Sequence, residues 1–307
     1  MPKVLVATVK PFASVAVQQI KEIVQKAGYE FALLEKYESE EALKQAVADA
    51  HALIVRSDKI HAGIMEAAPQ LKIIVRAGAG YDNIDLQAAT ERGIVVMNTP
   101  GQNANAVAEL ALGMMVYLAR NQFNGKPGTE LKGKTLGIHA FGHVGKRVAQ
   151  IARGFDMQLF AFDPFISDEE ISKEGVQPVH SVEALYEQCQ YVSLHIPANE
   201  KTIKSINFEL MSRMPQNAVL VNTARKEIIN EDDLLKMFAE RPDFKYISDI
   251  APDCADEIAE KYAGRFFFTP KKMGAQTAEA NINAGLAAAR QIVNFFEKGD
   301  RTFQVNK

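Results

Sequence analysis

The sequence predicts an α/β protein with two domains, each built on a doubly wound parallel sheet. Short runs rich in β-branched residues alternate with helical segments along the chain. This alternation occurs in two series, with a loop at residues 125–128 between them. A length of 307 residues also favours two domains over one. We therefore expect helices on both faces of each sheet, because consecutive parallel strands need a crossover connection.

The first series runs from the N-terminus to about residue 97. Strands are expected over residues 3–7, 31–34, 52–56, 72–76 and 94–97, with helices over 14–27, 40–48 and 60–67. A long apolar helix is expected over 103–120. The second series then has strands over 135–140, 158–162, 191–196, 218–222, 246–250 and 265–268, and an alanine-rich helix over 277–297. We expect the two long helices to join the domains, the last one carrying the chain back to the first domain.

The composition excludes several classes of protein. The net charge is −3 and no basic block is present, which argues against nucleic acid as the main partner. Cys189 and Cys254 lie far apart and in no metal-ligand spacing, so neither a disulfide framework nor a bound metal is expected. The N-terminus lacks the pattern of a signal peptide, and no apolar stretch is long enough for a membrane span. We therefore expect a cytoplasmic protein without a membrane partner.

A glycine-rich turn follows the strand over 135–140. Gly142, His143, Val144 and Gly145 match a G-x-G-x-x-G pattern with Ala140 in place of the first glycine, and a helix follows to about residue 153. Gly142 would let a pyrophosphate approach the backbone, and Gly145 would let the helix pack against the strand. The amides of His143 and Val144 would face the phosphates at the positive end of the helix. The alternative is a glycine turn in an α/β protein that binds no nucleotide.

An acidic residue in the right place makes the dinucleotide hypothesis stronger. Asp163 ends the next strand, 18 residues after Gly145, and Pro164 follows it. A carboxylate there accepts hydrogen bonds from both ribose hydroxyls and repels a 2′-phosphate, so NAD is favoured over NADP. We therefore assign a Rossmann NAD-binding domain to residues 98–283. A flavodoxin-like substrate domain would comprise 1–97 and 284–307, with a ligand cleft between the domains.

Seven stretches of sequence carry a resemblance that covers nearly the whole chain. They are RAGAGYDNID at 76–85, NTPG at 98–101, AVAE at 106–109, LGIHAFGHVG at 136–145, LHIP at 194–197, VNTAR at 221–225 and GAQTAEA at 274–280. Together they resemble the D-2-hydroxyacid dehydrogenase family, and within it the phosphoglycerate dehydrogenases. The resemblance implies an NAD-dependent dehydrogenase of small 2-hydroxy acids and a homodimer.

The resemblance also implies roles for individual residues. Arg225 would bind the substrate carboxylate and C2 oxygen, which a guanidinium can hold with two parallel bonds. The loop Ala77, Gly78, Ala79 and Gly80 would hold the carboxylate through its amides. Asp249 would bond the nicotinamide carboxamide. The other residues placed around NAD are Pro164, His195, Ile196, Pro197, Thr223, Ala224, Gly274 and Ala275.

Three polar residues invite a catalytic role that we do not assign. His195 is a tempting acid-base group, but LHIP is a strand end of the cofactor pocket, so we assign it to NAD. Asn83 and Asp85 follow the glycine loop, where turn formation and helix capping are their expected roles.

The chain departs from the family at its proton-transfer pair. Members carry Thr-Pro-His-Ile-Gly before the last helix, whereas this chain has TPKKMG over 269–274. Counting back from Gly274 puts Lys272 in the place of the histidine, with Lys271 as an extra residue. The glutamate that partners the histidine is replaced by Cys254. Lys271 and Lys272 could instead be surface lysines of an inactive site.

The two replacements are chemically consistent with each other. A lysine amine, with a pKa of about 10.4, holds its proton without help from a carboxylate. Oxidation of a hydroxy acid needs a neutral base, so the pKa must fall; desolvation and the charges of Lys271 and Arg225 would lower it. A nearby glutamate would oppose that shift. We therefore expect Lys272 and Arg225 to be the catalytic residues.

Positive residues at strand ends suggest a second anionic group on the substrate. Lys10, Arg56 with Ser57, and Arg76 each follow a predicted strand, where an open α/β sheet binds ligands. Lys59 is expected to be an ordinary surface charge. A phosphate is the simplest second anion, so we expect oxidation of 3-phosphoglycerate to 3-phosphohydroxypyruvate, the entry step of serine synthesis. The alternatives are a glycerate or hydroxypyruvate dehydrogenase and a non-catalytic NAD-binding interaction protein.

Overall fold

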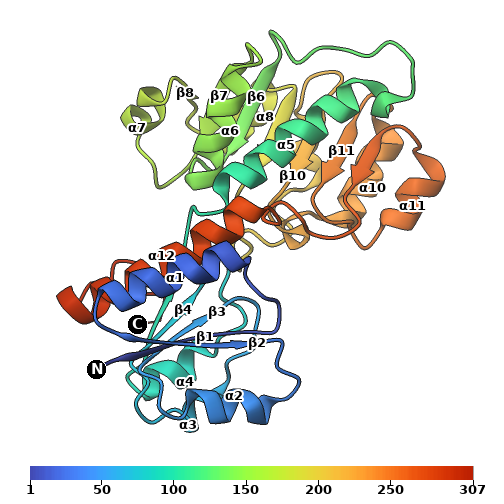
Figure 1. Cartoon of the computed structure of the whole chain (residues 1–307). Helices are drawn as coiled ribbons and strands as arrows, with labels where there is room; N and C mark the ends of the chain where they lie inside the picture. The colour runs from blue at the N-terminus through green and yellow to red at the C-terminus, as the bar shows by residue number, and fades with distance from the viewer. Residues whose placement is uncertain (307) are drawn as a thin grey trace. The chain divides into compact units, whose positions relative to one another are not determined.

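The structure is a computed structural model that describes residues 1–306. The chain divides into two compact units, Met1–Asn103 with Gln276–Lys307, and Ala104–Ala275. The sequence placed the boundaries at 97/98 and 283/284. A boundary at 284 would cut the helix α12 (Ala278–Lys298), which belongs to the first unit as a whole. Figure 1 shows α12 beside α1 (Ser14–Lys26) in that unit.

The first unit contains a five-stranded parallel sheet in the order β2-β1-β3-β4-β5. This is the flavodoxin-like order, in which the chain reverses direction between β1 and β3. The strands are β1 (Lys3–Thr8), β2 (Glu30–Glu35), β3 (Ala52–Val55), β4 (Ile73–Arg76) and β5 (Val95–Asn98). The remaining helices are α2 (Glu40–Val47), α3 (Ala62–Glu66) and α4 (Leu86–Glu91), of which α4 was not predicted.

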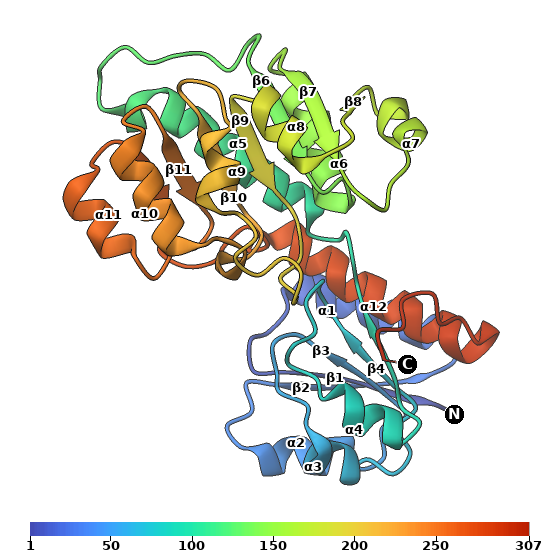
Figure 2. The ribbon, with the colours of Figure 1, turned by 180° about the vertical axis from the view of Figure 1, so that it is seen from behind.

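Helices cover both faces of this sheet, as the continuous apolar strands require. Side chains of α1 and α12 pack on one face, and those of α2, α3 and α4 on the other. Figure 2 shows the same two layers from behind. The last residues of the chain protect the edge strand β5. Asn306 accepts a hydrogen bond from the amide of Val96 at 2.7 Å and donates to the carbonyl of Ile94 at 2.9 Å.

The second unit contains a seven-stranded sheet in the order β12-β11-β10-β9-β6-β7-β8, and all of the described pairs are parallel. This is the Rossmann order with one added strand. The strands are β6 (Thr135–His139), β7 (Gln158–Phe162), β8 (Gln177–Pro178), β9 (Tyr191–Leu194), β10 (Val219–Asn222), β11 (Lys245–Ser248) and β12 (Phe266–Phe268). The two-residue β8 was not predicted, because so short a strand leaves no alternating pattern.

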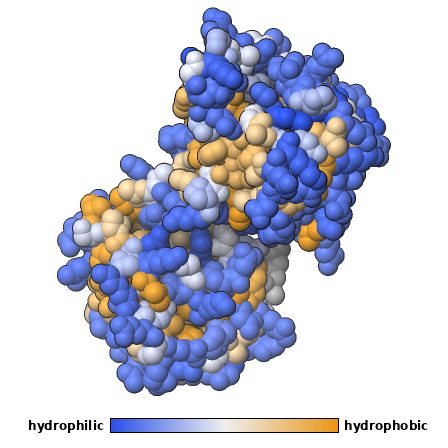
Figure 3. Space-filling view, turned by 90° about the vertical axis from the view of Figure 1, so that its right-hand side faces the viewer, coloured by the Kyte–Doolittle hydropathy of each residue, from blue (hydrophilic) through white to orange (hydrophobic). Residues whose placement is uncertain are grey.

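The helices of the second unit are again divided between two faces. They are α5 (Ala104–Ala119), α6 (His143–Arg153), α7 (Asp168–Lys173), α8 (Val182–Gln188), α9 (Phe208–Ser212), α10 (Glu231–Glu240) and α11 (Ala255–Lys261), with short 3-10 turns η1 (Asn121–Phe123) and η2 (Lys226–Ile228). The helices α5, α6 and α7 contribute to one core, and α8 to α11 to the other. The side drawn in Figure 3 is mostly hydrophilic and carries some apolar patches. Within residues 1–306 no helix is long and apolar enough to cross a membrane.

Candidate active site

The predicted glycine turn connects β6 to α6. Gly142 is the N-cap of α6, and no side chain caps this helix end. A Cβ added to Gly142 would meet nothing within 4 Å, so the space in front of the helix amides is open. At Gly145 a Cβ would come within 2.4 Å of the carbonyl oxygen of Ala140. The prediction that Gly145 allows close packing of helix on strand is therefore confirmed. The open helix end fits a phosphate-bearing cofactor.

Ala140 occupies the first glycine position at a cost in backbone energy. Its φ is +78°, in the left-handed region that glycine adopts freely and alanine does not. Ala140 is therefore a strained residue at the start of the turn between β6 and α6, and such strain often accompanies functional turns.

Asp163 directly follows β7 and organises the loop around the glycine turn. Its Oδ2 accepts a hydrogen bond from the amide of Phe141 at 2.8 Å, and its Oδ1 accepts one from the amide of Phe165 at 2.9 Å. Each carboxylate oxygen keeps a further lone pair for a ribose hydroxyl. Pro164 and Phe165 are exposed beside it, Phe165 to 92%.

His195 follows β9, and its surroundings do not suit acid-base chemistry. Its Nε2 lies 3.0 Å from Ser193 Oγ. Desolvation, with a smaller contribution from His139, lowers the pKa of His195 to about 3, so the imidazole is neutral at physiological pH. An imidazole with so low a pKa is poorly suited to acid-base catalysis near neutral pH. The neighbouring Ile196 is buried and Pro197 is exposed.

The loop between β12 and α12 carries Lys272, and Asp249 holds this loop. Asp249 is 1% exposed and follows β11. Its Oδ1 accepts hydrogen bonds from the Thr269 hydroxyl at 3.1 Å and from the Met273 amide at 2.8 Å. Its Oδ2 accepts one from the Gly274 amide at 2.8 Å. The carboxylate that we expected to bond the nicotinamide carboxamide thus also holds the loop that carries Lys272, a role that the sequence did not show.

Lys272 lies beside the other predicted catalytic residue. Its Nζ donates a hydrogen bond to the carbonyl oxygen of Ala224, and Arg225 is the next residue. The side chain is exposed, yet desolvation by the surrounding protein lowers the pKa of the amine, and the charge of Arg225 lowers it further, to about 8. Asp249 and Glu227 act in the opposite direction. Desolvation and Arg225 act as predicted, whereas Lys271, which we also expected to contribute, is not among the causes.

Backbone geometry after β10 presents Arg225. Asn222 is buried and accepts a hydrogen bond from the amide of Ala224 at 2.9 Å, while its Nδ2 donates to the carbonyl of Arg225 at 2.9 Å. Arg225 itself is exposed. The hydroxyl of Thr223 is buried and has no hydrogen-bond partner among the described residues. A buried polar group left in this state suits a residue that completes its bonds with a ligand.

Cys254 occupies the position that the family gives to glutamate. It is the N-cap residue of α11, and its amide donates to Glu231 at 2.9 Å. Burial, the charge of Glu231 and a hydrogen bond to it raise the pKa of the thiol to about 12. The thiol is therefore neutral and cannot hold a proton on a neighbouring base as a carboxylate does. In the described part of the chain, no group of acidic, histidine or cysteine side chains could hold a metal.

In the first unit, the side chain of Arg76, the last residue of β4, lies against the glycine loop that follows the strand. A Cβ on Gly78, whose φ is +152°, would fall 1.3 Å from Arg76 Nη1. The guanidinium therefore lies directly over the Gly78 backbone. Asn98 donates to the carbonyl of Ala79 at 2.6 Å and so holds the same loop. Ala77 and Gly78 are buried, whereas Ala79 and Gly80 are half-buried.

Arg56 is more deeply engaged by protein than the sequence suggested. Its Nη1 donates to the carbonyls of Lys10 and Pro11, both at 2.8 Å, and its Nη2 donates to Asn281 at 2.5 Å. The guanidinium also lies over the ring of Phe12. These contacts give Arg56 a structural role in fixing the segment after β1, which the sequence could not show.

The two polar residues after the glycine loop take the roles expected of them. Asp85 accepts a hydrogen bond from the amide of Ala88 at 2.9 Å and caps α4. Asn83 lies in a turn in which the amide of Ile84 donates to the carbonyl of Tyr81 at 3.0 Å, and its side chain donates to the carbonyl of Asp58, 25 residues earlier, at 2.7 Å. The predicted capping role of Asp85 and the predicted turn at Asn83 are confirmed, and Asn83 also connects this turn to the segment after β3.

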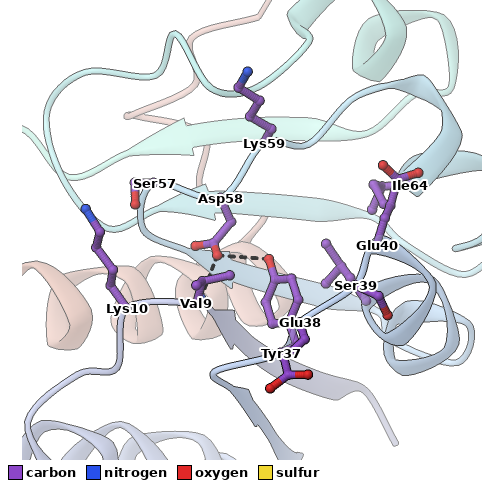
Figure 4. A pocket seen from close by; sticks show the side chains of 11 residues that line it. Val9, Lys10, Tyr37, Glu38, Ser39, Glu40, Ser57, Asp58, Lys59 and Ile64 are labelled. Atoms are coloured by element: carbon purple, nitrogen blue, oxygen red, sulfur yellow. Dashed lines mark hydrogen bonds between the residues drawn. The ribbon is translucent and has the colours of Figure 1, made fainter.

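A cavity of about 380 Å³ opens at the carboxyl ends of β1, β2 and β3. Lys10, Ser57 and Lys59 line it together with Glu38 and Glu40, as Figure 4 shows. Buried Asp58 lies at its base and accepts hydrogen bonds from Tyr37 and from the amide of Val9. Lys59, expected to be an isolated surface charge, thus shares a cavity with two of the predicted substrate residues.

Comparison with known proteins assigns the family. The model of the D-isomer specific 2-hydroxyacid dehydrogenase catalytic domain matches residues 6–306. The chain therefore belongs to this family of NAD-dependent dehydrogenases.

Individual relatives give a more detailed picture. The crystal structure of an NAD⁺-bound 3-phosphoglycerate dehydrogenase from Entamoeba histolytica is 50% identical, covers 100% of this chain and 99% of its own, and superposes with a TM-score of 0.86. A hydroxypyruvate reductase from Thermotoga maritima is 37% identical over 84% of this chain and 88% of its own. A D-3-phosphoglycerate dehydrogenase from Methanocaldococcus jannaschii is 36% identical over 83% of this chain, which spans only 51% of that relative.

Proposed function

We propose that the protein oxidises 3-phosphoglycerate to 3-phosphohydroxypyruvate with NAD. The observation that carries this proposal is the Lys272 amine beside Arg225, with a pKa lowered to about 8. An amine with this pKa has a substantial neutral fraction near pH 8, which can accept a hydroxyl proton. Its ammonium form can return that proton in the reverse reaction. This favours an active dehydrogenase over a non-catalytic NAD-binding protein.

In the proposed mechanism, Lys272 accepts the proton from the C2 hydroxyl as the C2 hydride leaves. Arg225 holds the carboxylate and the C2 oxygen through charge-assisted hydrogen bonds. Bound NAD supplies the nicotinamide ring that takes up the hydride. Arg225 also stabilises negative charge that develops on the C2 oxygen before its proton is fully transferred.

The cofactor would be held by residues that border the open end of α6. The amides of His143 and Val144 would face the pyrophosphate, and Asp163 the ribose hydroxyls. The buried Thr223 hydroxyl, without a protein partner within residues 1–306, supports ligand binding at the end of β10. The further cofactor residues that we propose are Gly142, Pro164, His195, Ile196, Pro197, Ala224, Asp249, Gly274 and Ala275.

For the substrate anions we propose the glycine loop at 77–80, Arg76, Arg56, Ser57 and Lys10. The identity of the E. histolytica protein, at 50% over the whole chain, supports a phosphorylated substrate. The T. maritima relative favours a second candidate, a reductase of hydroxypyruvate. The two candidates differ in whether the substrate carries a phosphate.

The deciding experiment follows NADH absorbance with purified protein. We expect kcat/KM for 3-phosphoglycerate to exceed that for D-glycerate by at least about 100-fold, since charge-assisted phosphate contacts contribute 1.5–3 kcal/mol each. Equal values for the two acids, or turnover with hydroxypyruvate alone, would refute 3-phosphoglycerate as the substrate.

A further inference from the structure

The lysine loop, residues 269–274, is held by hydrogen bonds that involve buried residues. Asp249, Thr269 and Gly274 are buried, whereas Lys271, Lys272 and Met273 are exposed. Side-chain burial therefore does not fix the segment that presents the amine. Its place depends on the hydrogen bonds made by the residues on either side of it.

The bonds lie next to Lys272 on both sides. The Thr269 hydroxyl is 2.9 Å from the carbonyl oxygen of Lys271 and 3.1 Å from Asp249 Oδ1, so its single hydrogen serves one acceptor at a time. After the lysine, the amides of Met273 and Gly274 both donate to Asp249. A Cβ on Gly274 would approach Asp249 Oδ2 to 2.8 Å, so glycine permits this close contact.

We propose that Thr269 and Asp249 are positioning residues that set the place of the Lys272 amine; this proposal rests on the function proposed above. Neither side chain needs to touch the reacting atoms. Thr269 donates either to the buried carboxylate or to the carbonyl of Lys271, which precedes Lys272, and Asp249 holds the two peptides that follow. The loop has one residue more than the family pattern, and this hydrogen-bonded base holds the longer loop in one conformation.

The test compares Thr269→Val and Thr269→Ala, which lose the hydroxyl, with Thr269→Ser, which keeps it. The first readout is steady-state kinetics. A displaced base impairs the chemical step more than binding, so we expect kcat to fall about 10- to 100-fold in the valine and alanine variants. The KM for NAD should change less than about threefold, and the serine variant should keep most of the parent's kcat.

The second readout needs no turnover. Only the neutral amine reacts with an acetylating reagent. The extent of trace acetylation of Lys272, measured by mass spectrometry at a series of pH values, therefore reports the pH at which half of the amine is neutral. We expect a midpoint near 8 in the parent and in Thr269→Ser. In Thr269→Val and Thr269→Ala the released amine becomes better hydrated, and the midpoint should rise towards that of an ordinary lysine.

The outcomes separate this proposal from the proposed function. If the variants without the hydroxyl kept the parent's acetylation profile, the positioning role would be overturned, whatever their kcat or melting temperature. If the parent turned over no 2-hydroxy acid, the proposed function would fail, and acetylation would still decide the role of Thr269. Two different substitutions that remove the hydroxyl keep the test usable if one of them fails to fold.

Discussion

At the scale of single residues, the exchange of histidine for lysine changes what the neighbours must do. A carboxylate beside a histidine base raises the pKa of the imidazole and so helps it keep its proton. A lysine base instead needs surroundings that lower its pKa, so that the amine can be neutral. Cys254, whose thiol is neutral, puts no negative charge at the position that the family gives to glutamate. Arg225 contributes further by repelling the ammonium form of Lys272.

Replacing Lys272 with alanine should abolish most of the activity. General acid-base catalysis contributes about 10²- to 10⁴-fold, so we expect kcat for oxidation to fall by at least about 100-fold in Lys272→Ala. The neighbouring Lys271→Ala is the matched control and should stay within a few-fold of the parent. A Lys272→Ala protein that matched its control would show that another group moves the proton.

The same residue predicts the pH dependence of the reaction. Oxidation needs the neutral amine, and the pKa of Lys272 is lowered to about 8. The rate of oxidation should therefore rise as the pH increases through about 8 and level off above it. Reduction needs the ammonium form and should decline over the same range. Initial rates from pH 6 to 10 would measure both limbs, and a flat profile in either direction would count against the assignment.

Arg225 and Lys272 could be recognised in the sequence because motifs fix their neighbours. The hydrogen bond from Thr269 to Asp249 could not, since it joins residues 20 positions apart whose approach only coordinates reveal. Arg56 shows a different limit. Its place after a strand predicted a ligand contact, and the sequence did not show that the guanidinium also contacts the backbone of Lys10 and Pro11 and the side chain of Asn281. The position of a residue at the end of a strand predicts where its backbone lies, but not which groups its side chain contacts.

At the scale of elements, the β6–α6 turn combines a required glycine with a strained alanine. Ala140→Gly would remove the strain at φ +78°, for which about 1–2 kcal/mol is typical, but would also make the unfolded chain more flexible. We expect a net stabilisation of up to about 1 kcal/mol, measured by urea unfolding. A loss of stability would show that the neighbouring structure already accommodates the alanine without strain.

Gly145→Ala should have the opposite effect. The new methyl group would lie 2.4 Å from the carbonyl oxygen of Ala140, a backbone atom that cannot rotate away. Overpacking of this kind costs about 1–3 kcal/mol, and it would push α6 away from β6. We expect a lower melting temperature and at least about tenfold weaker binding of NADH, measured by its fluorescence. Gly113→Ala, in a helix where a Cβ would meet nothing within 4 Å, serves as the control.

Long periodic elements were predicted well and short ones poorly. The strands and the two long helices could be recognised from apolar runs and alanine-rich periodicity. The helix α4 has six residues, and β8 has two. Neither is long enough to display a period, and both are stabilised by contacts with the rest of their unit. The domain boundary at 284 has a different cause, because it cut a long helix that the sequence itself predicted over 277–297 and that belongs to the first unit as a whole.

At the scale of the whole molecule, we propose a homodimer, as the resemblance implied. Light scattering after gel filtration should give about twice the 33.9 kDa of one chain. A mass that stayed at that of one chain over a wide range of concentrations would refute the dimer.

The first unit is made from both ends of the chain, and this affects its synthesis. Its core contains Val4 and Val6 of β1 together with Ala288 and Ile292 of α12. On the ribosome, the strands of the first unit are made before α12, which packs against them. Synthesis of the intervening residues 104–275 takes roughly 10 to 30 seconds at about 5–20 residues per second. During that interval the second unit can fold first. The nascent N-terminal strands meanwhile expose an apolar face, which makes them a natural substrate for chaperones.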